Sequence, residues 1–271
     1  MKITALAENT ACRADLKTIH GLSIYIETQN RKVLFDLCQD DVIFTNAEKL
    51  GVDLKEVDTV VISHGHSDHG GALKEFLAVN DKAKIYMRKE AFDPYFVDDA
   101  GEKKYIGLDT ELMGNERIVY TGEAGRIDDE LFVFSNIKAS LDTKTRSMLL
   151  KKTPDGFVQD DFGHEQNLLL TADGKVVLFT GCAHSGIGGI MPAALRYQQR
   201  IEAVFGGFHL YNPNSKETEP EELVRGLAEE LAAYDTVFYT CHCTGQKAYD
   251  LMREIMGEKL RYLSTGTTVE L

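Results

Sequence analysis

Four side chains that could bind metal ions lie within six residues of one another, directly after a short apolar run. His64, His66, Asp68 and His69 follow the β-branched residues 60–62, which predict a buried strand. Residues two apart on an extended segment point the same way, so the first two histidines could bind one ion. The last two side chains come after the chain has turned and could bind a second ion nearby. Imidazole and carboxylate ligands favour Zn, Mn or Fe over Mg or Ca.

The alternative is a surface loop that happens to be rich in His and Asp. The density of ligands argues against it, and so do Gly65, Gly70 and Gly71. Glycine lets the backbone bend closely around a bound group. The sequence therefore favours a metal site.

The run from Ser63 to Gly71, Ser-His-Gly-His-Ser-Asp-His-Gly-Gly, resembles the His-x-His-x-Asp-His signature of the metallo-β-lactamase superfamily. This resemblance implies an α+β fold, an αββα sandwich of two mixed β-sheets flanked by helices. The residue pattern alone predicts only a mixed α and β protein with many strands. Hairpins are predicted for residues 22–36 and around Asp173-Gly174.

Later motifs are similar to one branch of that superfamily, the metal-dependent hydrolases that resemble 7,8-dihydropterin-6-methyl-4-(β-D-ribofuranosyl)aminobenzene 5'-phosphate synthase. These motifs are Gly-Cys-Ala-His-Ser-Gly-Ile at residues 181–187, Gly-Gly-Phe-His-Leu at 206–210 and His-Cys-Thr-Gly at 242–245. The similarity extends over nearly the whole chain. It implies, in addition to hydrolysis, a synthase reaction as a second activity to consider.

Three apolar segments that read as strands also end in histidine, and convergence of their ends on one site would explain the repetition. We therefore expect His184 and His242 to be metal ligands. The third, His209, follows two glycines and is expected to face the substrate or to transfer a proton. The resemblance implies two sets of ligands: His64, His66 and His184 for one ion, and Asp68, His69 and His242 for the other.

Cys182 and His164 are two further candidates. Cys182 follows Thr180-Gly181, where many two-metal relatives have an aspartate that bridges both ions. The thiol could be a ligand, or the bridge could be water or hydroxide alone. For His164, a role in the site and a packing role are both open.

Two more cysteines, Cys241 and Cys243, flank His242. Neighbours of a residue on an extended segment point away from it. We therefore expect both thiols to pack in the interior and not to bind metal.

The composition is that of a globular protein: of the 271 residues 43% are hydrophobic, and the formal net charge is −13. A site assembled from distant segments favours a single domain over residues 1–271. Residues 89–116 are hard to assign and are read as an inserted loop or short helices. They could cover the site and select the substrate, or be a solvated insertion without such a role.

The acidic balance disfavours nucleic acid as a partner, since that would need a basic surface. Five cysteines without a regular framework argue against a disulfide scaffold. The sequence contains no segment that resembles a secretion signal or a membrane span. These features predict a cytoplasmic protein that acts on a small molecule, and they give no indication of its oligomeric state.

Together, these observations predict a hydrolase in which metal-activated hydroxide attacks a small phosphorylated or ester-like substrate. Two divalent ions, most simply Zn with Mn or Fe as alternatives, would be the cofactors. Asp68 would orient the nucleophile and His209 would protonate the leaving group. The alternatives are a synthase-type transferase that releases diphosphate and a di-iron redox protein. The full ligand set argues against a binding protein with a relic site.

Overall fold

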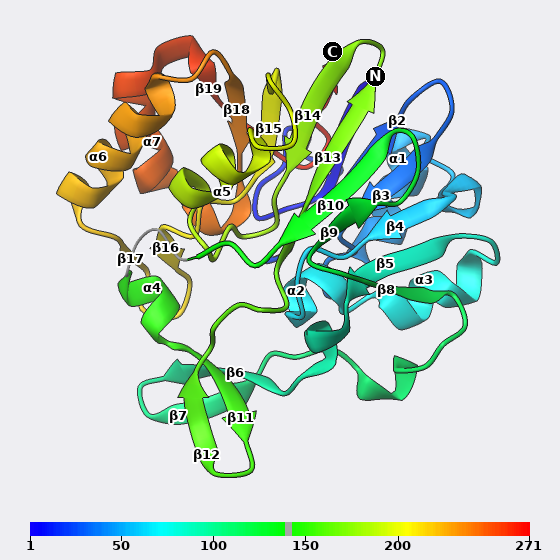
Figure 1. The fold of residues 1–271 in the computed structure, drawn as a ribbon, viewed down its shortest axis with the longest axis horizontal. Helices are drawn as coiled ribbons and strands as arrows, with labels where there is room; N and C mark the ends of the chain where they lie inside the picture. Colours follow the sequence, from blue (N-terminus) through cyan, green and yellow to red (C-terminus); the bar gives the residue numbers. More distant parts are fainter. Residues whose placement is uncertain (139–142) are drawn as a thin grey trace.

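The computed structural model describes residues 1–138 and 143–271 (Figure 1). Two seven-stranded mixed sheets pack face to face, and helices cover the outer face of each. This arrangement confirms the predicted αββα sandwich. Among the described helices, none is long and apolar enough to cross a bilayer.

The first sheet joins antiparallel strands at one side to parallel strands at the other. The strands β1, β2 and β3 pair antiparallel, and β3, β4, β5 and β8 pair parallel. The β2–β3 pair is the first predicted hairpin. In spatial order the strands are β20 (Thr268–Glu270), β1 (Lys2–Ala7), β2 (Ser23–Glu27), β3 (Lys32–Phe35), β4 (Thr59–Val61), β5 (Lys84–Arg88) and β8 (Ile118–Thr121).

The second sheet has the same mixed character. The strands β14, β15, β18 and β19 pair parallel, whereas β9, β10, β13 and β14 pair antiparallel. The β13–β14 pair is the predicted hairpin around Asp173-Gly174. In spatial order the strands are β19 (Leu260–Tyr262), β18 (Val237–Thr240), β15 (Ala203–Gly206), β14 (Lys175–Phe179), β13 (Gln166–Ala172), β10 (Leu131–Ser135) and β9 (Ala124–Arg126).

Amphipathic helices close the outer faces. On α6, Val224, Leu227, Ala228 and Leu231 are buried, and this spacing places them on one face of the helix. The α-helices are α1 (Val42–Leu50), α2 (Ser67–Gly70), α3 (Leu73–Val79), α4 (Lys144–Ser147), α5 (Ile187–Ala194), α6 (Glu221–Ala232) and α7 (Gln246–Met256). The 3-10 helices are η1 (Leu54–Glu56), η2 (Lys89–Phe92), η3 (Thr110–Leu112), η4 (His242–Thr244) and η5 (Gly257–Lys259).

The segment at 89–116 contains the expected short helices, η2 and η3, and between them a β-hairpin that was not expected. Its strands β6 (Tyr95–Asp99) and β7 (Glu102–Tyr105) join β11 (Leu149–Thr153) and β12 (Gly156–Gln159) in a small separate sheet. This sheet projects from the sandwich at the bottom of Figure 1. Pairing of β6 with the much later β11 could not be read from local pattern. Two short strands, β16 (Tyr211–Asn212) and β17 (Glu217–Thr218), form a further hairpin.

The apolar layer between the two main sheets fixes how their strand ends meet. Phe205 on β15 stacks between Phe179 and Tyr239, with ring centroids 5.4 Å and 4.5 Å away. Burying a side chain of this size contributes roughly 1.5–3 kcal/mol. The carboxyl ends of parallel strands lie at the same edge of a sheet. The loops after β3 and β4 in one sheet, and after β14, β15 and β18 in the other, therefore lead to one region.

Candidate metal centre

Three buried histidines from two different loops form the first group of ligands. His64 and His66 follow β4, and His184 follows β14. One ring nitrogen of each histidine lies within 4.8 Å of a ring nitrogen of each of the other two. The Nε2 atoms of His64 and His66 are buried and lack a hydrogen-bond partner in the described part of the chain. Buried polar atoms are rarely left unpaired, so a metal ion fits this group. Burial and the neighbouring imidazoles lower the pKa of His64 and His184 well below the usual value, and neutral rings are what a metal requires.

A buried carboxylate aligns the ligand loop. Asp36, at the end of β3, accepts hydrogen bonds from the Ser63 backbone N–H (2.7 Å), the Ser63 hydroxyl (2.7 Å) and His69 Nδ1 (2.6 Å). The Ser63 Oγ atom in turn lies 2.8 Å from His64 Nδ1. Fixing Nδ1 of a ligating ring sets its tautomer and leaves Nε2 for the ion. Sequence analysis gave Asp36 no role.

The second predicted group is also brought together. Asp68 Oδ2 lies 3.2 Å from His242 Nε2 and 3.8 Å from His69 Nε2, and these two nitrogens are 3.3 Å apart. Asn9 Oδ1 accepts from His242 Nδ1 at 2.9 Å. Burial opposes ionisation of Asp68, but His69 and His242 outweigh it and hold the pKa of the carboxyl well below its usual value. The predicted partition into two ligand sets thus has a geometric basis, and metal binding by them stays a prediction.

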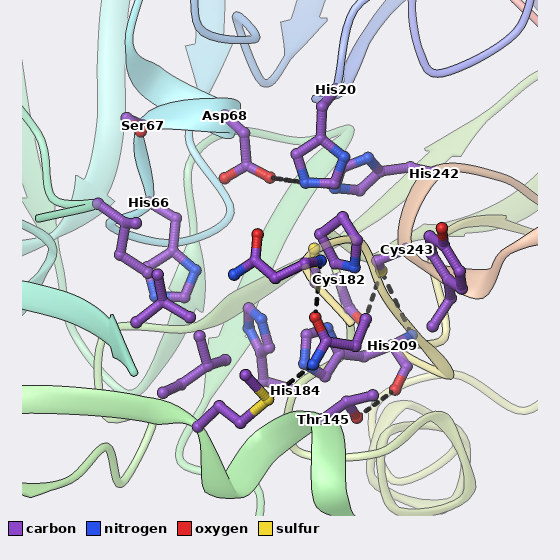
Figure 2. A pocket seen from close by; sticks show the side chains of 18 of the residues that line it. His20, His66, Ser67, Asp68, Thr145, Cys182, His184, His209, His242 and Cys243 are labelled. Carbon is purple, nitrogen blue, oxygen red and sulfur yellow. Dashed lines mark hydrogen bonds and ion pairs between the residues drawn. The ribbon is translucent and has the colours of Figure 1, made fainter. Parts of the chain in front are cut away.

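His20 belongs to the same region, although the sequence suggested no role for it. Its Nε2 lies 3.4 Å from Asp68 Oδ2, and its ring is 4.6 Å from that of His242 (Figure 2). The signal that could have identified it is Gly21, where a Cβ atom would be 2.5 Å from the Asp68 carbonyl oxygen. With His20, all eight histidines of the chain form one continuous set of ring contacts.

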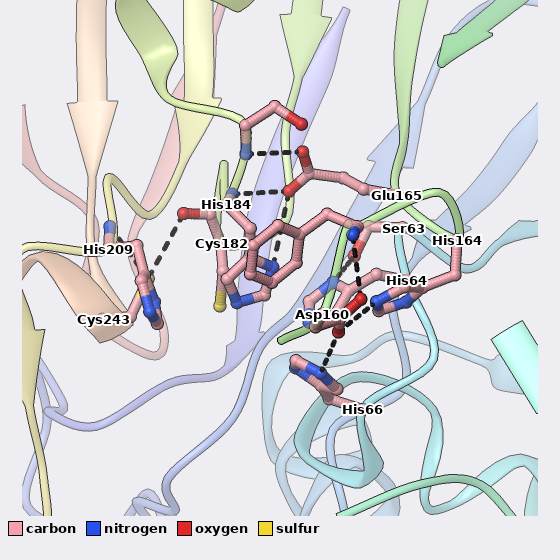
Figure 3. Close-up of polar contacts among 12 residues, drawn as sticks. Ser63, His64, His66, Asp160, His164, Glu165, Cys182, His184, His209 and Cys243 are labelled. Carbon is pink, nitrogen blue, oxygen red and sulfur yellow. Dashed lines mark hydrogen bonds and ion pairs between the residues drawn. The ribbon is translucent and has the colours of Figure 1, made fainter. Parts of the chain in front are cut away.

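His164 contacts the ligand loop, and both of its ring nitrogens bind protein groups. Its Nε2 donates to Asp160 Oδ2 at 2.9 Å (Figure 3), and its Nδ1 accepts from the Gly65 backbone N–H at 2.8 Å. Tyr95 stacks on the ring at 3.9 Å. Both ring nitrogens are therefore engaged, and neither is free for an ion in this arrangement. The Asp160 carboxylate also lies 3.8 Å from His66 Nε2.

Glu165 holds the loop that carries His184. Its carboxylate accepts from the backbone N–H groups of His184 (2.6 Å) and Ser185 (3.0 Å), and it lies 3.5 Å from His184 Nδ1. Neither Asp160 nor Glu165 was identified from the sequence. Both belong to the loop before β13, which carries no ligand motif.

A cavity with a volume of about 200 Å³ opens above both ligand groups. Its apolar lining comes from the small sheet and adjacent loops, including Val97, Ile106, Met148 and Leu149. His209 also lines it, and both of its ring nitrogens are without a hydrogen-bond partner among the described residues. Its backbone has φ +51°, and such positions cluster at functional sites. His209 is thus placed for the predicted contact with substrate.

The family is decided by comparison with known proteins. The family model described as the metallo-beta-lactamase superfamily matches residues 17–224, which is most of the chain. The chain belongs to the metallo-beta-lactamase superfamily. The comparison and the fold agree with the resemblance seen in the His-x-His-x-Asp-His motif.

Two proteins that are similar to this chain over its full length carry different descriptions, one a synthase and the other a hydrolase. The 7,8-dihydropterin-6-methyl-4-(beta-D-ribofuranosyl)-aminobenzene-5'-phosphate synthase of Methanocaldococcus jannaschii is 26% identical over 289 aligned residues, covering 100% of this chain and 96% of the relative. The crystal structure of Tm1679, described as a metal-dependent hydrolase of the beta-lactamase superfamily, has 27% identity, a TM-score of 0.82 and coverage of 100% and 99%. These comparisons confirm the prediction of a metal-dependent hydrolase-type enzyme of this superfamily.

Cys182 follows Thr180-Gly181, the position at which the resemblance to the superfamily implies a bridging ligand. Its Sγ atom lies 3.1 Å from His69 Nε2 and it is 3% exposed. It can share an ion with His64 and His69, or with His242 and Cys243. Cys182 therefore lies between the two ligand groups.

The expectation that Cys243 packs away from the site was wrong. His242 has φ +52° and starts the short helix η4, so the chain is no longer extended there. The alternation of a strand does not apply, and Cys243 lines the cavity beside His242. Cys241, still on the strand side of this turn, packs between the sheets as expected.

Gly65, between two ligands of the first group, gives a test of how tightly the loop is packed. A Cβ atom there would lie 2.2 Å from the Ala91 carbonyl oxygen and 2.8 Å from two more backbone atoms. Because backbone cannot rotate out of the way, Gly65→Ala is expected to lower the free energy of unfolding by about 1–3 kcal/mol or more. Gly122→Ala, where a Cβ meets nothing within 4 Å, is the control in chemical denaturation. Equal stability of the two variants would contradict the packing described.

Proposed function

We propose that this protein hydrolyses a small phosphorylated or ester-like molecule. The observation that carries the proposal is the pair of adjacent, buried ligand groups beneath one cavity. Divalent ions held by His64, His66 and His184, and by Asp68, His69 and His242, would lower the pKa of water to about 7 and polarise the electrophile. Zinc is the expected metal, and manganese and iron are the alternatives.

The chain's own side chains would divide the remaining work. Asp68 faces three imidazoles from different segments, which hold its carboxylate in one orientation, and it would orient the attacking water. His209 lines the cavity with both ring nitrogens unpaired in the described structure, and it would give a proton to the leaving group. The apolar lining would hold the organic part of a small substrate and exclude water from it. An acidic surface does not suit nucleic acid.

A second candidate is a synthase that releases diphosphate. The full-length similarity to the synthase of Methanocaldococcus jannaschii favours it. In that reaction the attacking group would be an organic nucleophile instead of water. Incubation with a pterin diphosphate and an aminobenzene riboside phosphate separates the two candidates, because only a synthase forms a coupled product together with diphosphate.

The direct test combines metal analysis with a hydrolysis screen. Protein purified without chelator should contain about two equivalents of Zn, Mn or Fe by elemental mass spectrometry. It should also hydrolyse at least one member of a panel of phosphate monoesters, diesters and carboxylic esters. A protein that binds no metal even after reconstitution would contradict the proposal. The same would be true of a metal-loaded protein that couples the pterin substrates and hydrolyses nothing in the panel.

Metal removal is expected to destabilise the fold, because it leaves buried ligands without partners. At a free metal concentration 100 times the Kd, binding stabilises the native state by about 2.7 kcal/mol. Thermal unfolding followed by circular dichroism should therefore occur at lower temperature after dialysis against a chelator, and readdition of zinc should restore it. Identical unfolding curves for loaded and stripped protein would contradict this expectation.

A further inference from the structure

Two buried thiols from different elements meet beside the second group of ligands. Cys182 follows β14, Cys243 lies in η4, and each is 3% exposed. Their sulfur atoms and one nitrogen of His242 all lie within 4.8 Å of one another. Figure 2 shows both cysteines close to His242 at the wall of the cavity. The ligand sets implied by the superfamily resemblance include neither an ion-binding Cys243 nor a pair of thiols.

The surrounding backbone makes room for the Cys243 sulfur and orients it. Gly207 has no side chain where a Cβ atom would lie 2.4 Å from Cys243 Sγ. The His209 backbone N–H points to this sulfur at 3.3 Å, and the thiol donates to the Cys182 carbonyl oxygen at 3.6 Å. An N–H donor stabilises a sulfur that carries negative charge, as a metal-bound thiolate does.

We infer that Cys182 and Cys243 bind the second metal ion through sulfur, together with His242. The inference rests on the proposed function, since it concerns the ion expected there. Each thiol loses its proton to solvent as its sulfur binds the ion, so that two protons are released for two thiolate bonds. Sulfur ligands select zinc, cobalt or other borderline and soft ions over manganese and magnesium. The second position would therefore take a thiophilic divalent ion.

The alternative is a pair of thiols that only pack beside the histidines. Metal-free protein loaded with Co²⁺ distinguishes the two, because cobalt bound to thiolate has a strong near-ultraviolet charge-transfer band and cobalt bound by nitrogen and oxygen alone lacks it. We expect the band in the parent protein, about half its intensity in Cys182→Ser and Cys243→Ser, and its loss in the double variant. Cys241→Ala is the matched control, because Cys241 packs between the sheets, and it should keep the full band.

The same titration separates failure of this inference from failure of the proposed function. Cobalt that binds at two equivalents without the band, or a folded Cys243→Ser protein with undiminished intensity, overturns sulfur ligation and leaves the hydrolase proposal standing. Absence of any cobalt binding overturns both.

A labelling experiment on the parent chain covers the case in which the serine variants do not fold. Zinc should suppress alkylation of Cys182 and Cys243, measured by peptide mass spectrometry. Cys12 is exposed and should react equally with and without zinc. Equal labelling of Cys243 in both states contradicts the inference.

Discussion

His66→Ala should abolish hydrolysis while leaving the protein folded. The ring is buried and shares the first ligand group with His64 and His184. Its loss removes one of the three nitrogens expected to bind the first ion and opens a space among polar side chains that water can fill. Catalysis by a bound ion amounts to several kcal/mol, and each 1.4 kcal/mol is a factor of ten in rate. We therefore expect kcat/KM to fall by about 10³-fold or more.

The measurement pairs kinetics with metal content in the same preparation. His66→Ala should hold less metal than the parent protein, and its far-ultraviolet circular dichroism should be unchanged. Glu75→Ala on α3, exposed to solvent, is a control that should keep both activity and metal. A His66→Ala protein that turns over at the parental rate after metal removal would refute a metal-dependent reaction at this site. Unfolding of the variant would instead show that the ring is needed for packing.

The hairpins and the grouping of the expected ligands could be predicted from the sequence because both depend on local patterns, whereas the αββα sandwich was implied by the resemblance to the superfamily. The run from Ser63 to Gly71 places a strand, a turn and four ligands within one short segment. The motifs ending in His184 and His242 also end predicted strands, and parallel strands deliver their carboxyl ends to one edge. These features need no knowledge of distant contacts.

What the sequence could not give depends on pairing between remote segments. Asp36, Asp160 and Glu165 carry no motif of their own, and each matters only because folding places it against a ligand. His20 likewise looked isolated until β1, β2 and the ligand loop packed together. The error at Cys243 had another cause, a left-handed residue at His242. Residues other than glycine seldom adopt this conformation. The alternation expected of an extended strand therefore placed the Cys243 side chain on the wrong side of the chain.

The second large effect is expected at Asp36, which supports both ligand groups although it binds neither ion. Its two oxygens accept from three donors, the Ser63 N–H and hydroxyl and His69 Nδ1, and it is fully buried. Asp36→Ala leaves these donors without an acceptor and should lower the free energy of unfolding by about 3–5 kcal/mol. Asp36→Asn is the more informative change, because Asn has the same shape and tolerates the left-handed backbone at this position, φ +61°.

An asparagine at residue 36 has one acceptor oxygen where the carboxylate has two. If its amide NH₂ faces His69, two donors oppose each other, and the imidazole must move its proton from Nδ1 to Nε2, the nitrogen that faces His242. If the amide is turned the other way, the NH₂ opposes the Ser63 N–H and displaces the loop. Either arrangement spoils a ligand, and losing such a supporting contact typically weakens metal binding 10–100-fold.

Calorimetric titration of metal-free Asp36→Asn with zinc measures this loss directly, without reference to substrate. Asp58→Asn is the matched control, since Asp58 also accepts backbone N–H at a strand end, from Lys32 at 2.8 Å, but stands away from the ligands. We expect weaker zinc binding only in the Asp36 variant, with a fold that stays intact in both. Unchanged affinity in Asp36→Asn would mean that the ligand histidines are oriented by packing alone. The buried carboxylate would then serve stability and not the metal centre.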